Sequence, residues 1–342
     1  MNSKRPAFVS PRYTMPRDGP AHITVIKPGW LTTVQDLGRY GYQQYGVPVS
    51  GAMDRRSFIV ANRLVGNPDN DGGLEITING PELLFEHDAI IAVTGADLSA
   101  SVNGIGIPQW TSVRIERGSR LAFGARRTGT RGYLAIAGGI DVPIVLGSRS
   151  THTYSRTGGM QGRALGRGDV LICGKRPPRT RAAIGRTLPE KLRPVYSTAT
   201  ALRVLPGPQV SAFGEEPLTR LMSGSYQIST QSDRMGYRLE GPKLAQAEAR
   251  EWISDGTAMG ALQVPADEQP ILLMADRQTT GGYPKIAVVI SADLHLAAQL
   301  LPGESIQFKT TTLAEAQALM KAEWKEIDQA LPPYHARSTT NE

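Results

Sequence analysis

The stretch from Ala275 to Ala287 holds the residue types best suited to chemistry: an acid, an arginine, an amide and two hydroxyls, followed by two glycines. Apolar runs at 271–274 and 286–290 flank it, and both have the length and composition of strands. Glycine permits close approach of a ligand, and loops held by rigid strands commonly carry function, although an ordinary hairpin loop would show the same pattern. Because an arginine between buried strands is costly without an anionic partner, we predict that Arg277 holds a substrate carboxylate or stabilises an oxyanion.

The chain contains this stretch twice. Residues 125–137 match residues 275–287 at a constant offset of 150, and seven of the thirteen positions are identical. A period of 150 residues indicates two duplicated domains rather than a solenoid. The second copy has gained Asp276 and Gln278, which can hold an arginine rigidly and present an amide to a substrate. We therefore place the functional site nearer the second copy.

Two further carboxylates are predicted to orient the arginine or to move a proton, so the predicted catalytic residues are Arg277, Asp233 and Asp36. Alternatively, Asp36 only pairs with Arg39 across a turn, and Tyr283, like Tyr133 in the first copy, is a barrel-core residue with a satisfied hydroxyl. The predicted substrate-binding side chains share hydrogen-bonding or carboxylate-clamping groups. They are Arg39, Arg149, Ser150, Arg234, Asp276, Gln278, Thr279 and Tyr283.

Length, charge and cysteine content limit the number of domains and the classes of partner that this protein can have. A chain of 342 residues is expected to form two domains, and its single cysteine, Cys173, excludes an internal disulfide. The net charge of +7 arises from residues 1–20, which carry +3, and residues 175–193, which carry +6, so the rest of the chain carries −2. This distribution argues against nucleic-acid binding and favours a basic tail and a solvated linker. No apolar run has the length of a membrane span and no signal peptide is visible, so we expect a cytoplasmic protein.

Motifs for nucleotides, metals and nucleophilic catalysis are not found in the sequence. The segment from Gly168 to Lys175 lacks the spacing and hydroxyl of a phosphate loop, and no Gly-x-Ser-x-Gly elbow occurs. The five histidines are scattered without metal-ligand spacing. The predicted ligand is therefore a small polar amide or acid, with no cofactor held by a recognisable motif and no metal.

The elements that must position these residues are mainly short strands punctuated by glycine and proline at barrel-like spacing. Asp54 is predicted to cap a helix that ends near Val65, before Gly66. Thr312 and Glu315 form a capping box for a C-terminal helix to about residue 330, which would dock on a barrel. The predicted segments are a disordered tail (1–20), a first domain (21–174), a basic linker (175–199), a second domain (200–310), a C-terminal helix (311–331) and a tail (332–342).

Longer motifs resemble a known family over about residues 22–310. They are Pro28-Gly-x-x-Thr-Thr-Val-Gln-Asp-x-Gly-Arg39, Gly46-Val-Pro-x-Ser-Gly-Ala-Met-Asp54, Leu146-Gly-Ser-Arg-Ser150, Ser232-Asp-Arg-Met-Gly-Tyr-Arg-Leu-Glu-Gly-Pro242 and Ala275-Asp-Arg-Gln-Thr-Thr-Gly-Gly-Tyr283. These motifs look like the biotin-dependent carboxyltransferase family. That family includes the second subunit of allophanate hydrolase, the C subunit of 5-oxoprolinase, the antagonist of the Kip sporulation-kinase inhibitor, and the carboxyltransferase region of urea carboxylase.

The resemblance implies two tandem cyclophilin-like β-barrel domains, in agreement with the internal duplication. It also implies a bacterial protein that works with a companion B subunit of the Kip-inhibitor type, with a third, A-type subunit as a further candidate partner. The favoured function is one component of an ATP-dependent 5-oxoprolinase, which converts 5-oxoproline to glutamate. The alternatives are a non-catalytic regulatory protein that captures a Kip-inhibitor-type partner, and a carboxyltransferase component that moves a carboxyl group from carboxybiotin to urea or another amide. ATP or carboxybiotin would be supplied by the partners, because this chain has no nucleotide loop and no biotin-carrier Met-Lys-Met.

Overall fold

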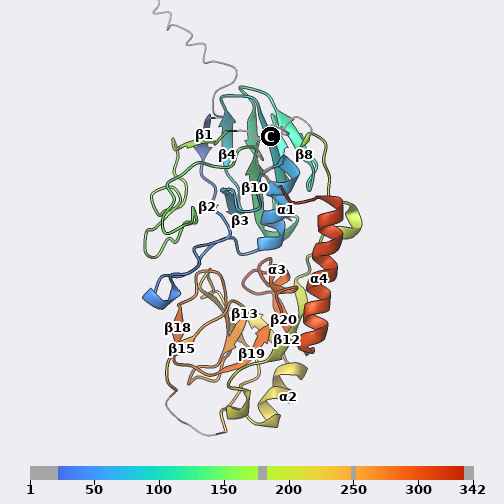
Figure 1. Cartoon of the computed structure of the whole chain (residues 1–342). Helices are drawn as coiled ribbons and strands as arrows, with labels where there is room; N and C mark the ends of the chain where they lie inside the picture. The colour runs from blue at the N-terminus through green and yellow to red at the C-terminus, as the bar shows by residue number, and fades with distance from the viewer. Residues whose placement is uncertain (1–21, 176–182, 248–251, 335–342) are drawn as a thin grey trace, which may run out of the picture.

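The computed structural model describes residues 22–175, 183–247 and 252–334. The described chain is mainly β, with four α-helices and three short 3-10 helices. Figure 1 shows a first half with β1, β10 and α1, a second half below it with β12 and β19, and helix α4 running along the side of both. No helix in the described ranges is long and apolar enough to span a membrane.

The first half consists of two sheets built on opposite faces of one apolar core. Buried side chains such as Ile23, Leu74 and Leu134 fill the space between them. The six-stranded sheet has the order β11 (Val170–Ile172), β1 (His22–Lys27), β4 (Glu82–Phe85), β9 (Arg120–Ala122), β6 (Ser101–Val102), β7 (Ile105–Gly106). The five-stranded sheet has the order β2 (Leu31–Gln35), β3 (Gly73–Thr77), β10 (Thr128–Ile136), β5 (Ala89–Asp97), β8 (Ser112–Ile115).

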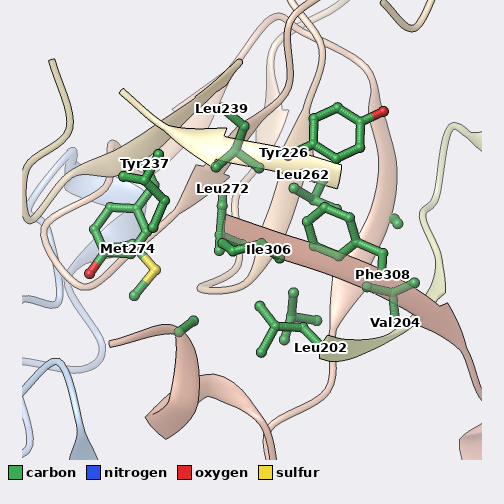
Figure 2. Close-up of a cluster of buried hydrophobic side chains, with 14 of the residues drawn as sticks. Leu202, Val204, Tyr226, Tyr237, Leu239, Leu262, Leu272, Met274, Ile306 and Phe308 are labelled. Carbon is green, nitrogen blue, oxygen red and sulfur yellow. The ribbon is translucent and has the colours of Figure 1, made fainter. Parts of the chain in front are cut away.

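The second half is a closed seven-stranded barrel. Leu202, Tyr226 and Phe308 meet in its core, where the rings of Tyr226 and Phe308 have centroids 5.8 Å apart (Figure 2). The order around the barrel is β12 (Ala199–Pro206), β19 (Lys285–Val289), β16 (Ala261–Gln263), β17 (Ile271–Leu273), β14 (Gly236–Glu240), β13 (Ser225–Ile228), β20 (Ser305–Thr310). A separate pair joins β15 (Asp255–Gly256) to β18 (Thr280–Gly281).

The two helices predicted from the sequence, α1 and α4, are present with the predicted caps. The Asp54 carboxylate accepts a hydrogen bond of 2.8 Å from the backbone N–H of Ser57, and Gly66 ends the helix with a φ of 82°. The Thr312–Glu315 capping box is present. The α-helices are α1 (Arg55–Val65), α2 (Glu215–Ser223), α3 (Leu294–Ala297) and α4 (Leu313–Ala330), and the 3-10 helices are η1 (Gln43–Tyr45), η3 (Glu190–Leu192) and η4 (Val210–Ala212).

The prediction of a mainly β protein is confirmed, and a closed barrel is present in the second half. The strand pairing of the first half forms two open sheets instead of a second closed barrel, so the tandem duplication stays a prediction. The first repeated stretch enters β10, and the second crosses a loop before it enters β19. Tyr133 is a core residue whose hydroxyl donates to Glu75, but Tyr283 is 49% exposed. The core interpretation is wrong for Tyr283 because it lies on the loop before β19, not within a strand.

The predicted linker and the C-terminal helix pack differently from the prediction. The described part of the predicted solvated linker covers the edge of β8: the Ser112 N–H donates to the Arg186 carbonyl, and Leu188 is fully buried. The edge strand β8 would otherwise expose unpaired backbone N–H and C=O groups, and the linker segment satisfies part of them. Helix α4 docks on α1 through buried Ile327 and through a 2.6 Å ion pair between Arg63 and Asp328. The predicted tails lie outside the described residues, apart from 332–334.

Candidate functional site

The two halves meet at a buried ion network centred on Arg234. Its Nε donates to Asp276 at 2.8 Å, its Nη2 donates to the Gly51 carbonyl at 2.7 Å, and its Nη1 donates to Glu75 of the first half. Although burial disfavours the charged form, Asp276 and Glu75 raise the pKa of Arg234 above its ordinary value. Because both carboxylates and the guanidinium are buried, this network fixes the two halves relative to each other.

Gln299 forms a second polar link across the same interface. Its Oε1 accepts hydrogen bonds of 2.9 Å from the backbone N–H groups of Thr130 and Arg131. Its Nε2 donates to Asp54 at 2.8 Å and to the Arg131 carbonyl at 3.0 Å. A single amide from the second half therefore satisfies groups on β10 and at the start of α1.

A pocket of about 390 Å³, here called the Arg277 pocket, lies next to this network, since its lining residue Ser50 donates a hydrogen bond to Asp276. Both halves and α4 contribute to its walls. The apolar wall consists of Val49, Ala52, Met53, Ile59, Met259, Ala292, Leu294, Met320 and Trp324. The polar lining consists of Tyr40, Ser50, Arg55, Arg56, Arg277, Ser291, His295 and Glu323.

Arg277 has no carboxylate within ion-pair distance among the described residues. Its side chain donates long hydrogen bonds of 3.4 Å to the carbonyls of Thr257 and Met274. Burial lowers its pKa; the Tyr40 hydroxyl opposes this shift and the charge of Arg55 adds to it. A guanidinium stays protonated in proteins, so Arg277 presents a cation that lacks a counter-ion in the described chain.

The other charges of the pocket leave it positive. Arg55 donates to the Leu37 carbonyl at 3.2 Å and to the Tyr40 hydroxyl, neither of which is a carboxylate. Arg56 is compensated by an ion contact with Glu323. Burial lowers the pKa of His295, which favours its neutral form. A positive pocket with an apolar wall suits a compact anion with a small apolar body.

A second pocket of about 600 Å³, here called the Arg131 pocket, is lined by Asp276 and Arg234 of the network. Among its charged lining residues, Arg131 and Arg234 are balanced by Asp233 and Asp276, and the nearby Glu75 carboxylate adds a further negative charge. Arg131 donates to the Tyr237 hydroxyl at 2.8 Å. This pocket therefore suits uncharged polar groups better than an anion.

A hydrogen bond joins the two pockets. Ser50, in the Arg277 pocket, donates through its Oγ to Asp276 Oδ1 at 2.7 Å. Asp276, in turn, lines the Arg131 pocket and holds Arg234.

The structure does not bring the three predicted catalytic residues together. Arg277 lines its own pocket, and Asp233 lines the Arg131 pocket, where its Oδ1 accepts from the backbone of Met235 at 2.7 Å. Asp36 lines neither pocket. Its carboxylate accepts from Ser148 Oγ at 2.6 Å and from the Arg149 N–H at 2.6 Å, so it organises a buried loop.

The predicted substrate-binding residues are likewise divided. Arg234 and Asp276 lie together in the Arg131 pocket. The other six lie outside both pockets. In the first half, Arg39 donates to the Ser150 carbonyl at 2.5 Å, Ser150 donates to Asp36, and Arg149 lies 4.0 Å from Asp141. In the second half, Gln278 donates to Gln263 at 3.1 Å, the Thr279 carbonyl accepts from the Thr257 N–H at 3.0 Å, and Tyr283 is exposed. No local motif in the sequence marks Glu75, Arg55 or Glu323, and Arg131 lies in the first repeated stretch without being predicted as a site residue. Only the fold reveals that these residues belong to the two pockets and the network between them.

The family model for the carboxyltransferase domain, subdomain A and B, matches residues 45–310. The chain belongs to this family. It is 41% identical over 296 residues to the C subunit of 5-oxoprolinase from Escherichia coli, covering 86% of this chain and 93% of that protein. It is 35% identical over 322 residues to urea amidolyase of Saccharomyces cerevisiae, covering 89% of this chain but only 17% of that protein.

A solved structure of this family has the same fold. The crystal structure of urea amidolyase from K. lactis matches with a TM-score of 0.84 and 34% identity, over 94% of this chain and 20% of that one. This chain thus spans about a fifth of the fungal enzyme, so the activity of the whole fungal protein does not transfer to it directly.

Proposed function

We propose that this chain is the C subunit of a multi-component, ATP-dependent 5-oxoprolinase, and that the Arg277 pocket holds the carboxylate of 5-oxoproline. The observation that carries the proposal is the cationic Arg277 without a counter-ion in the described chain, in a pocket that remains positive. 5-Oxoproline is a compact monoanion with an apolar ring edge, so it complements both the guanidinium and the methionine-rich wall. Urea is uncharged and would leave Arg277 unpaired.

The role of this chain is binding and orientation. A bidentate contact with a carboxylate would fix the ring relative to groups supplied by the companion B-type and A-type subunits, which would also provide the ATP site. Asp36 acts as a positioning residue, because its hydrogen bonds hold the loop that carries Tyr40 to the pocket. We assign no step to Asp233, which faces the other pocket.

A second candidate function is carboxyl transfer to an amide from carboxybiotin carried on a partner. The similarity to the fungal urea amidolyases favours it, since the fold match extends over 94% of this chain. The charge-balanced Arg131 pocket would then be the better site for a neutral amide such as urea.

Reconstitution tests the proposal. The purified chain is expected to show negligible hydrolysis of 5-oxoproline, because the sequence has no nucleotide or biotin motif. Addition of its companion subunits should restore glutamate formation that depends on ATP. The measurement is glutamate release with and without ATP, with urea and bicarbonate as a parallel substrate. Turnover by the chain alone, or turnover of urea but not of 5-oxoproline by the complex, would overturn the assignment.

A further inference from the structure

Arg56 and Glu323 face the Arg277 pocket from two different helices. Arg56 lies on α1 and Glu323 on α4, and their side chains form an ion contact between Nε and Oε1. The Arg56 side chain is 9% exposed and that of Glu323 is 24% exposed. Both residues line the pocket, so a ligand there would meet this pair directly.

The charged side chains that line the pocket form two groups. Arg277 has Tyr40 and Arg55 as its charged or polar neighbours, and no carboxylate of the described chain reaches it. In the second group, His295 lies near Arg56 and Glu323. The first group is therefore cationic, whereas in the second group the Glu323 carboxylate neutralises Arg56.

Arg56 could bind an anion if the charge of Glu323 were removed. The Arg56 Nη2 donates to the Leu192 carbonyl, while its buried Nη1 has no hydrogen-bond partner in the described chain. Without the charge of Glu323, Arg56 would offer a second guanidinium to the pocket. With that charge in place, a second ligand carboxylate would be repelled and could not pair with Arg56.

We infer that Glu323 is a specificity-determining residue that restricts the Arg277 pocket to ligands with one carboxylate. This inference rests on the proposed function and deepens it. 5-Oxoproline carries one carboxylate, and opening of its ring creates a second one. The pocket would thus accept the closed ring and disfavour linear dicarboxylates of the same carbon number.

The test compares two probes, 5-oxoproline and glutarate, by isothermal titration calorimetry on the full chain. The wild type should bind 5-oxoproline at least tenfold more tightly than glutarate. Glu323→Gln should tighten glutarate binding at least tenfold, with 5-oxoproline binding changed less than threefold. Glu326→Gln is the matched control, because Glu326 lies about one turn further along α4, does not line this pocket and pairs with exposed Lys191 at 3.4 Å.

Glu323→Asp separates charge from folding. It keeps the carboxylate, so it should keep the wild-type preference within threefold even if loss of the charge in the glutamine variant impairs folding. Binding of 5-oxoproline with an unchanged preference in Glu323→Gln, or a lost preference in Glu323→Asp, would overturn the inference and leave the proposed function standing. Failure of every variant, including the wild type, to bind 5-oxoproline would overturn the pocket assignment and the inference together.

Discussion

Replacing Arg277 by alanine is expected to lower the kcat/KM of the reconstituted complex for 5-oxoproline by at least about a hundredfold, the usual effect of removing a charge-stabilising donor from an active site. Arg277 makes no ion pair within the described chain, so the replacement strands no carboxylate there. Its effect on stability should stay within about 1–2 kcal/mol, the range of an ordinary substitution. The measurement is ATP-dependent glutamate release, with the melting temperature of each variant as a check on folding.

Arg127→Ala is the matched control for this prediction. Arg127 occupies the same position in the first repeated stretch, but its side chain is 72% exposed and its nearest carboxylate, on Asp97, is 3.8 Å away. It lines neither pocket, so its loss should change kcat/KM by less than about threefold, as for other surface substitutions. Equal losses in both variants would show that the pocket is not the reason for the effect of Arg277.

Replacing Arg234 by methionine is expected to cost about 3–5 kcal/mol of unfolding free energy, the usual result of breaking a buried ion pair. The replacement leaves Glu75 and Asp276 buried without their counter-ion, since they are only 2% and 4% exposed. Urea denaturation measures the loss.

Arg120→Met provides the comparison for Arg234. Arg120 pairs with Glu82 at 3.1 Å, but its side chain is 57% exposed. Such surface pairs contribute about 0–1 kcal/mol, so this variant should be nearly as stable as the wild type. If the two variants lost the same small amount, the Arg234 network would not be holding the halves together.

Local signals in the sequence are sufficient for several elements. Asp54 and Gly66 bound α1 as predicted because a side-chain cap and a positive-φ glycine act within one turn of the helix. The need of Arg277 for an anion stays a prediction, and the structure places this residue in a pocket without an ion partner in the described chain. In both cases the physical requirement belongs to the residue and its near neighbours.

Other features depend on contacts between distant segments. Glu75 lies between Leu74 and Ile76 in β3, and its ion partner Arg234 is 159 positions away in the sequence. Glu323 reaches the pocket because α4 folds back onto α1, which no local pattern reveals. Asp36 is predicted to act on a substrate, but the fold surrounds its carboxylate with Ser148, Ser150 and the backbone of Arg149. Sequence motifs thus locate the polar residues but cannot divide them between two pockets and a buried loop.

Binding of 5-oxoproline compared with 2-pyrrolidinone, the same lactam ring without the carboxylate, tests most directly whether Arg277 holds the substrate carboxylate. Calorimetric titration of the full chain, and of the assembled complex without ATP, gives the affinity for each compound. We predict that the wild type binds 5-oxoproline at least tenfold more tightly than 2-pyrrolidinone, and that Arg277→Met binds the two with nearly equal affinity. Equal binding of both compounds by the wild type, or an undiminished preference for 5-oxoproline in Arg277→Met, would contradict this central claim.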